Sequence, residues 1–131
     1  MPNVKTEYTI GAKPTPYCPD GEIRAIHVAY TPPSNLQIGD IIEVIDLDDN
    51  TQVVDWAVFG LPTGLQGSLG ELNAGRTALS TTWKAGITGV QRADSAAHLA
   101  NTSGKRRVGF VPSAAQTAAG TVNLVLWTRA I

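Results

Sequence analysis

The sequence has one cysteine and two histidines, and this shortage excludes several kinds of chemistry. Because Cys18 has no second cysteine to pair with, no disulfide can form within the chain, and packing must stabilise the fold. A zinc cluster or a Cys/His nucleophile pair would need Cys18, His27 and His98 to converge, and no Gly-x-Ser-x-Gly or His-Glu-x-x-His motif supports either site. We expect no metal, no cofactor and no enzymatic activity. A glycosidase-like carboxylate pair stays open, because nothing singles out two of the eleven acidic residues.

Charge is also sparse. Charged residues make up 16% of the chain, against about 25% in typical soluble domains, and ten basic residues oppose eleven acidic ones. The net charge of −1 lacks the basic footprint that phosphate-backbone binding requires, so we expect no nucleic-acid partner. A neutral polar surface loses its water more cheaply than a charged one, which favours a surface that protein partners cover.

Long apolar runs are missing as well. No stretch approaches the roughly 18 consecutive apolar residues of a membrane-spanning helix, so we expect no membrane partner. The first residues, 1–7, lack the apolar core of a signal peptide. We therefore expect synthesis and assembly inside a cell.

The acidic sequence Asp46-Leu47-Asp48-Asp49-Asn50 begins like a calcium-binding loop. The rest of that motif is absent, because Thr51 stands where the loop needs glycine and Ala57 where it needs glutamate. The segment therefore predicts a hairpin turn between two strands.

Most of the chain has the period-two alternation or the β-branched composition of strands. The predicted strands are residues 4–10, 22–30, 41–45, 53–59, 65–72, 106–111 and 121–130. The last of them carries apolar side chains on both faces, so we expect it to be central or covered. About seven short strands separated by turn signals predict an all-β fold, a β-sandwich or jelly-roll-like domain.

The N-terminal region has a different character. Pro14, Pro16 and Pro19, with a Pro-Asp-Gly turn signal, exclude regular structure over residues 11–21. We predict that residues 1–20 form an extended arm and that residues 21–131 form a single β-sandwich domain. We expect the arm, residues 1–19, to pack on another subunit or on the capsid and not on its own core. Its partner-binding candidates are Tyr8, Ile10 and Tyr17.

The β-character fades between residues 74 and 100. Leu79, Trp83 and Ile87 are four residues apart, which predicts one short helix over residues 77–85. Residues 91–104 are polar and predict a surface loop or a further helical turn. The basic run 105–107 indicates a solvated loop end, with an acidic or partner-contacting patch as the alternative.

The three tryptophans have different expected roles. Trp56 and Trp127 lie within predicted strands among aliphatic neighbours, so we expect both in the core. Trp83 is a candidate partner anchor on the helix, because exposed tryptophans are favoured at the centres of interfaces. A sugar-binding face built from tryptophans is the alternative.

Three segments together resemble small bacteriophage virion proteins encoded near the major capsid gene. They are Gly39-Asp40-Ile41-Ile42-Glu43-Val44 followed by Val53-Val54, Gly67-Ser68-Leu69-Gly70-Glu71-Leu72-Asn73-Ala74-Gly75 with Thr77-Ala78-Leu79 and Trp83, and Ala118-Ala119-Gly120-Thr121-Val122-Asn123-Leu124-Val125-Leu126. The resemblance spans most of the chain beyond Gly39 and rests on pattern and order, with no diagnostic motif. Residues 1–33 and 91–104 depart from it.

The resemblance implies a capsid decoration or cement protein. Such a protein is a β-sandwich on the outer shell, often a trimer, which clamps neighbouring major capsid subunits. It implies the major capsid protein and copies of the chain itself as partners, and a place on the capsid surface of the virion after synthesis in the host cytoplasm. A tail, fibre or head–tail joining component and a carbohydrate-binding β-sandwich module are the alternative functions.

Overall fold

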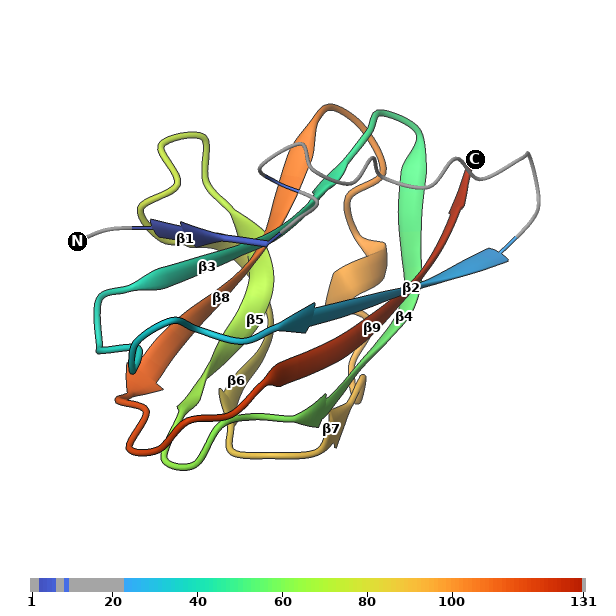
Figure 1. The fold of residues 1–131 in the computed structure, drawn as a ribbon. Coiled ribbons are helices and arrows are strands. Elements are labelled where there is room, and N and C mark those ends of the chain that lie inside the picture. Colours follow the sequence, from blue (N-terminus) through green and yellow to red (C-terminus); the bar gives the residue numbers. More distant parts are fainter. Residues whose placement is uncertain (1–2, 7–8, 10–22, 131) are drawn as a thin grey trace.

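The computed structural model describes residues 3–6, 9 and 23–130, which form two β-sheets packed face to face (Figure 1). The elements are β1 (Asn3–Lys5), β2 (Ile23–Tyr30), β3 (Ile41–Leu47), β4 (Thr51–Gly60), β5 (Gln66–Leu72), β6 (Leu79–Ile87), β7 (Gln91–Arg92), the 3-10 helix η1 (Ala97–Leu99), β8 (Arg106–Ala114) and β9 (Val122–Ala130). The five-stranded sheet has the order β1-β3-β8-β5-β6, and the four-stranded sheet has the order β2-β9-β4-β7.

The strand pairing is nested. β2 pairs with β9, β3 with β8, β4 with β7 and β5 with β6, all antiparallel. The chain therefore folds like one long hairpin whose two halves pair along their length and then wrap into two sheets, which is the jelly-roll arrangement. The prediction of an all-β sandwich is confirmed.

Alternation along β9 shows how the sequence builds the core. Leu124 and Leu126 are buried between the sheets, while Val125 and Trp127 lie on the outer face. β9 pairs with β2 on one side and β4 on the other, as expected for a strand with apolar residues on both faces. The core combines residues of both sheets, among them Ile26, Val28, Ile42, Ile45, Leu47, Val53, Trp56, Val58, Leu69, Trp83, Val108, Phe110, Leu124 and Leu126.

The helix predicted over residues 77–85 is wrong. Residues 79–85 of this segment belong to β6, which pairs with β5 at the edge of the five-stranded sheet. A spacing of four is also a multiple of the strand period of two, so Leu79, Trp83 and Ile87 share one face of a strand as well as one face of a helix. The only helical element among the described residues is η1, a single turn.

The predicted position is right for Trp56 and wrong for Trp83 and Trp127. Trp56 is buried, as predicted, and its ring stacks on that of Trp83 with centroids 6.5 Å apart. Trp83 is only 3% exposed, so its expected position on an exposed helical face is wrong. Trp127 is half-buried on the outer face of β9, so its expected position in the core is also wrong.

The structure changes two further predictions, the hairpin after β3 and the position of the N-terminal arm. The tight turn after β3 is present, and Asn50 adopts the left-handed conformation there with φ of 60°. It does not make a hairpin, because β3 and β4 belong to opposite sheets.

Near the N-terminus, β1 pairs in parallel with β3, and Val4 packs against the chain's own core. The arm expected over residues 1–19 therefore begins on its own sheet.

The two tryptophans give the first prediction. Trp83→Ala should lower the free energy of unfolding by about 3–5 kcal/mol, because it removes a large buried side chain and leaves a cavity. Trp127→Ala should cost much less, because part of that ring already meets solvent. Urea unfolding followed by circular dichroism would measure both, and a larger loss for Trp127→Ala would contradict the assignment.

Candidate functional site

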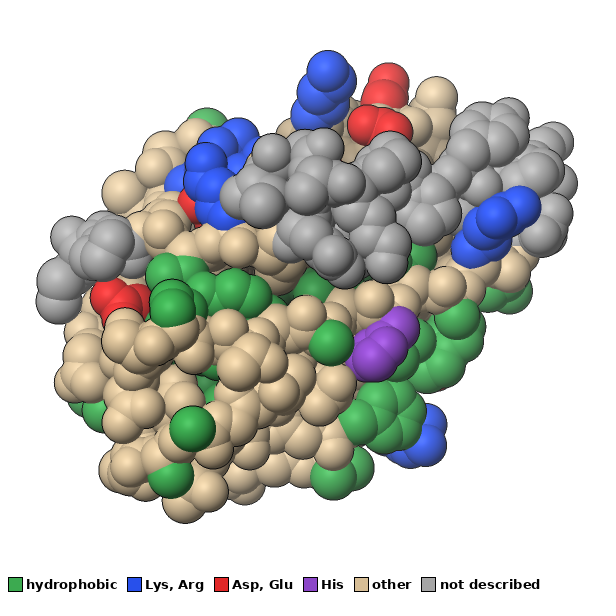
Figure 2. All heavy atoms as spheres, in the orientation of Figure 1, with side chains coloured by type: hydrophobic (Ala, Val, Ile, Leu, Met, Phe, Trp, Pro, Cys, Tyr) green, Lys and Arg blue, Asp and Glu red, His purple; other side chains and the backbone are tan. Residues whose placement is uncertain are grey.

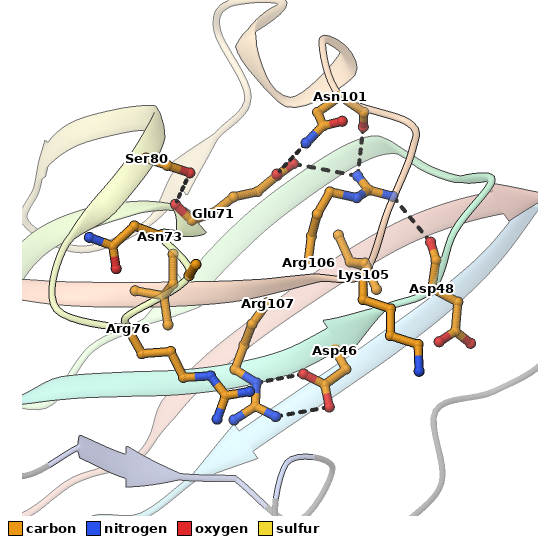
Figure 3. A pocket seen from close by; sticks show the side chains of 13 residues that line it. Asp46, Asp48, Glu71, Asn73, Arg76, Ser80, Asn101, Lys105, Arg106 and Arg107 are labelled. Carbon is orange, nitrogen blue, oxygen red and sulfur yellow. Dashed lines mark hydrogen bonds and ion pairs between the residues drawn. The ribbon is translucent and has the colours of Figure 1, made fainter.

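A polar pocket of about 390 Å³ lies where β8 begins, close to the ends of β3 and β5. Figure 3 shows its side chains, and Arg106 and Arg107 extend to opposite sides of β8. The lining residues are Asp46, Leu47, Asp48, Glu71, Leu72, Asn73, Ala74, Arg76, Ser80, Asn101, Lys105, Arg106 and Arg107.

Arg106 joins three separate segments of the chain. Its guanidinium donates to the carbonyl oxygens of Asn101 at 2.6 Å, Asp48 at 3.2 Å and Thr51 at 2.5 Å. Nη1 also lies 3.5 Å from the carboxylate of Glu71, and both side chains are more than nine-tenths buried. The second carboxylate oxygen of Glu71 accepts from Asn101 Nδ2 at 3.1 Å. One cation thus satisfies the carbonyls of two chain turns and neutralises a buried acid.

Arg107 forms a second cluster on the other side of β8. Its Nε and Nη2 donate to the two carboxylate oxygens of Asp46, the residue directly opposite on β3. Its Nη1 donates to Glu43 Oε1 at 2.5 Å, and the Glu43 side chain is 2% exposed. Arg76 approaches the same oxygen at 3.6 Å from the loop between β5 and β6.

Burial and pairing act on Arg107 in opposite directions. Burial alone lowers the pKa of its guanidinium, but the hydrogen bonds and negative charges of Asp46 and Glu43 outweigh it and raise the pKa above its ordinary value. Arg107 therefore stays a cation wherever the protein is folded. The solvated loop end predicted for residues 105–107 is wrong for both arginines, since only Lys105 of the three is exposed.

The pairing limits what this pocket can do chemically. Glu43 and Glu71 are each bound to a guanidinium, so neither is placed as a free general acid or as a metal ligand. Throughout residues 3–6, 9 and 23–130, no group of three or more His, Cys, Asp and Glu side chains could hold a metal ion. The pocket is best described as a structural junction.

The two histidines lie in different parts of the fold. His27 is on the exposed side of β2, where Nε2 lies 3.2 Å from Asn123 Oδ1. His98 is buried edge-on against Trp83, and its Nε2 lies 3.2 Å from the carbonyl oxygen of Val54. Cys18 lies outside the described residues. None of the helices in the described part is long and apolar enough to cross a membrane.

A second candidate surface is the outer face of the four-stranded sheet. Ile23 is 56% exposed and Phe59 45% exposed, although both are large apolar side chains. Val125 and Trp127 are half-buried between them on β9. The guanidinium of Arg92 lies 5.6 Å from the centre of the Phe59 ring. In Figure 2, which views the molecule from the side of β2 and β9, charged side chains are sparse and hydrophobic ones lie among neutral polar groups.

The predicted partner-binding residues do not form this surface. Trp83 is in the core, and Tyr8, Ile10 and Tyr17 lie outside the described residues. Ile23 and Phe59 were not singled out from the sequence. The alternation of side chains along a strand could have identified them. Ile26, Val28 and Val58 point into the core, so Ile23 and Phe59 point outward.

The fold of this chain is also found in a known structure. A structure described as the capsid of Ralstonia phage GP4 contains a chain that superposes with a TM-score of 0.73. The two sequences are 22% identical, and the match covers 98% of each chain. At this identity the likeness shows a shared fold over the whole length. No protein-family model matches the sequence, and no curated protein matches it.

The junction at β8 gives the second prediction. Arg106→Met should lower the free energy of unfolding by about 3–5 kcal/mol, because it leaves Glu71 buried without its cation. The matched control is Lys84→Met, which breaks the exposed pair between Lys84 Nζ and Asp94 Oδ2 and should cost at most about 1 kcal/mol. Denaturant unfolding would measure both variants, and equal losses would contradict a structural role for Arg106.

Proposed function

We propose that this chain is a non-enzymatic structural protein of a phage virion. The observation that carries the proposal is the full-length match to the capsid chain of Ralstonia phage GP4, which covers 98% of both chains. Jelly rolls occur in viral capsids and in lectins, so the fold by itself does not determine the function. The match to a capsid chain over nearly every residue favours the virion role over the others.

Within the virion, we propose the role of a decoration or cement protein. It would bind the outer capsid surface and clamp neighbouring major capsid subunits. The support is the outer face of β2-β9-β4-β7, where Ile23 and Phe59 are exposed although both are large apolar side chains. Exposed large apolar side chains on one sheet face are typical of a surface that another protein covers. This role places the protein on the capsid surface after synthesis in the host cytoplasm.

Capsid binding is the third prediction. The chain should bind capsids assembled from the major capsid protein of the same genome and should raise their melting temperature, because a ligand that prefers the assembled state stabilises it. Cosedimentation and scanning calorimetry would measure the two effects. Binding to tails and not to capsids would instead favour a tail or head–tail joining component.

Variants test which face binds. Ile23→Ser combined with Phe59→Ser should weaken capsid binding by about tenfold or more, because apolar anchors carry a large share of interface energy. The matched control is Ile38→Ser, which removes an equally exposed side chain that lies between β2 and β3 and outside the sheet. An equal effect of the two variants would overturn the assignment of the face.

We also propose that the protein is a homotrimer. A low-charge domain of this size, with strands that carry apolar side chains on both faces, is suited to burying area against copies of itself, and capsid lattices offer three-fold positions. The fourth prediction is a light-scattering mass of three times the 13.8 kDa chain at micromolar concentration, without capsid. A mass of one chain would count against a preformed trimer.

Carbohydrate binding is the competing function from another class. Two of the three tryptophans, Trp56 and Trp83, are in the core and are not placed to stack on a sugar. Trp127 lies half-buried on the outer sheet face and is the remaining candidate. Glycan-array binding that Trp127→Ala abolishes would favour this function over the virion role.

A further inference from the structure

The first strand is an addition to the jelly roll. The nested pairs of β2 with β9, β3 with β8, β4 with β7 and β5 with β6 are complete without β1. β1 contributes three residue pairs at the edge of the five-stranded sheet, in the parallel register Asn3 to Ile41, Val4 to Ile42 and Lys5 to Glu43. The rest of the fold therefore does not need this strand to come from the same chain.

The surface that receives β1 is nevertheless specific. Thr6 is only 2% exposed, its N–H donates to the carbonyl oxygen of Glu43 at 3.2 Å, and its hydroxyl donates to that of Val44. Val4 packs against the core. A buried threonine with both polar groups satisfied shows that the edge of β3 forms a fitted acceptor for the strand.

Arg76 completes this acceptor in an unfavourable backbone conformation. Its φ is 56°, in the left-handed region that residues other than glycine rarely adopt. In this position its carbonyl oxygen accepts from Asn3 Nδ2 at 3.0 Å, while its guanidinium lies 3.6 Å from Glu43 Oε1. Strained residues gather where a site must be held in one shape, and this one contacts the incoming strand.

The covalent connection is long enough for the strand to reach another molecule. Residues 10–22 separate Thr9 from β2, and these 13 residues span at most about 45 Å when extended. A compact domain of this length has a radius of gyration of about 14 Å, which corresponds to a diameter of about 36 Å. The connection therefore exceeds the width of one domain.

We propose that β1 of one copy occupies the acceptor beside β3 of a neighbouring copy, so that the copies exchange their N-terminal strands. The strand makes the same contacts in either chain, so exchange costs little and links the copies without a new interface. The inference deepens the proposed homo-oligomer and is independent of capsid binding. It would link the copies of the proposed homotrimer into a ring.

Disulfide trapping in the intact protein tests the exchange. One chain carries Asn3→Cys and a second carries Ile41→Cys, the opposite residue in the register, both with Cys18→Ser. The two are mixed at about 10 μM, exchanged through mild denaturation and oxidised. The disulfide between the chains should form about 100-fold more than collision allows, because a docked strand has a millimolar effective concentration.

The matched control replaces Ile41→Cys by Ala85→Cys, an exposed position on β6 at the opposite edge of the same sheet. Equal cross-linking of the two mixtures overturns the proposal. So does a double variant, Asn3→Cys with Ile41→Cys in one chain, that closes only within single chains. Cross-linked oligomers that do not bind capsids would support strand exchange and contradict the capsid role. Capsid binding without cross-linking between chains would support the capsid role and contradict strand exchange.

A second variant avoids the buried position Ile41. Thr6→Pro removes both hydrogen bonds of Thr6 and should release β1 while the jelly-roll pairing remains. Light scattering should then give a single-chain mass with an unchanged far-ultraviolet circular-dichroism spectrum. An unchanged oligomer would overturn the proposal.

Discussion

The fold depends on how Arg106 and Arg107 are neutralised on the two sides of β8. Arg106 connects the β3–β4 turn, the segment before β8 and the buried carboxylate of Glu71. Arg107 holds β8 to β3 through Asp46 and Glu43. A buried charge without its partner is strongly destabilising, so these pairs fix the register of β3, β8 and β5.

The sequence predicted the class of fold because strand alternation is a local property. It predicted the central position of β9 for the same reason, since apolar residues on both faces require cover. It did not predict the sheet to which each strand belongs. β3 and β4 follow one another across a tight turn and yet lie in opposite sheets, and nothing local distinguishes that crossing from a hairpin. The jelly-roll order is set by pairings between residues as distant as Ile23 and Arg129.

The errors over functional residues have the same origin. Trp83 lies in the core because a spacing of four residues fits the strand β6 as well as a helix. Trp127 lies on the outer face because Leu124 and Leu126 set the inward face of β9. The basic run could not be assigned from sequence because the acids that bind it are about 35 to 64 residues away in the chain. Only the fold brings Glu43 and Glu71 to the two sides of β8.

The two proposed contacts use different parts of the sandwich, so they are compatible. The apolar face with Ile23 and Phe59 belongs to the four-stranded sheet, whereas the acceptor for β1 lies at the edge of the five-stranded sheet. A copy can therefore lay one sheet on a capsid subunit while its other sheet receives a strand from a neighbour. In the proposed role, the sheet face binds the shell and the exchanged strand connects adjacent copies. Donating a strand connects them without using the face that binds the shell.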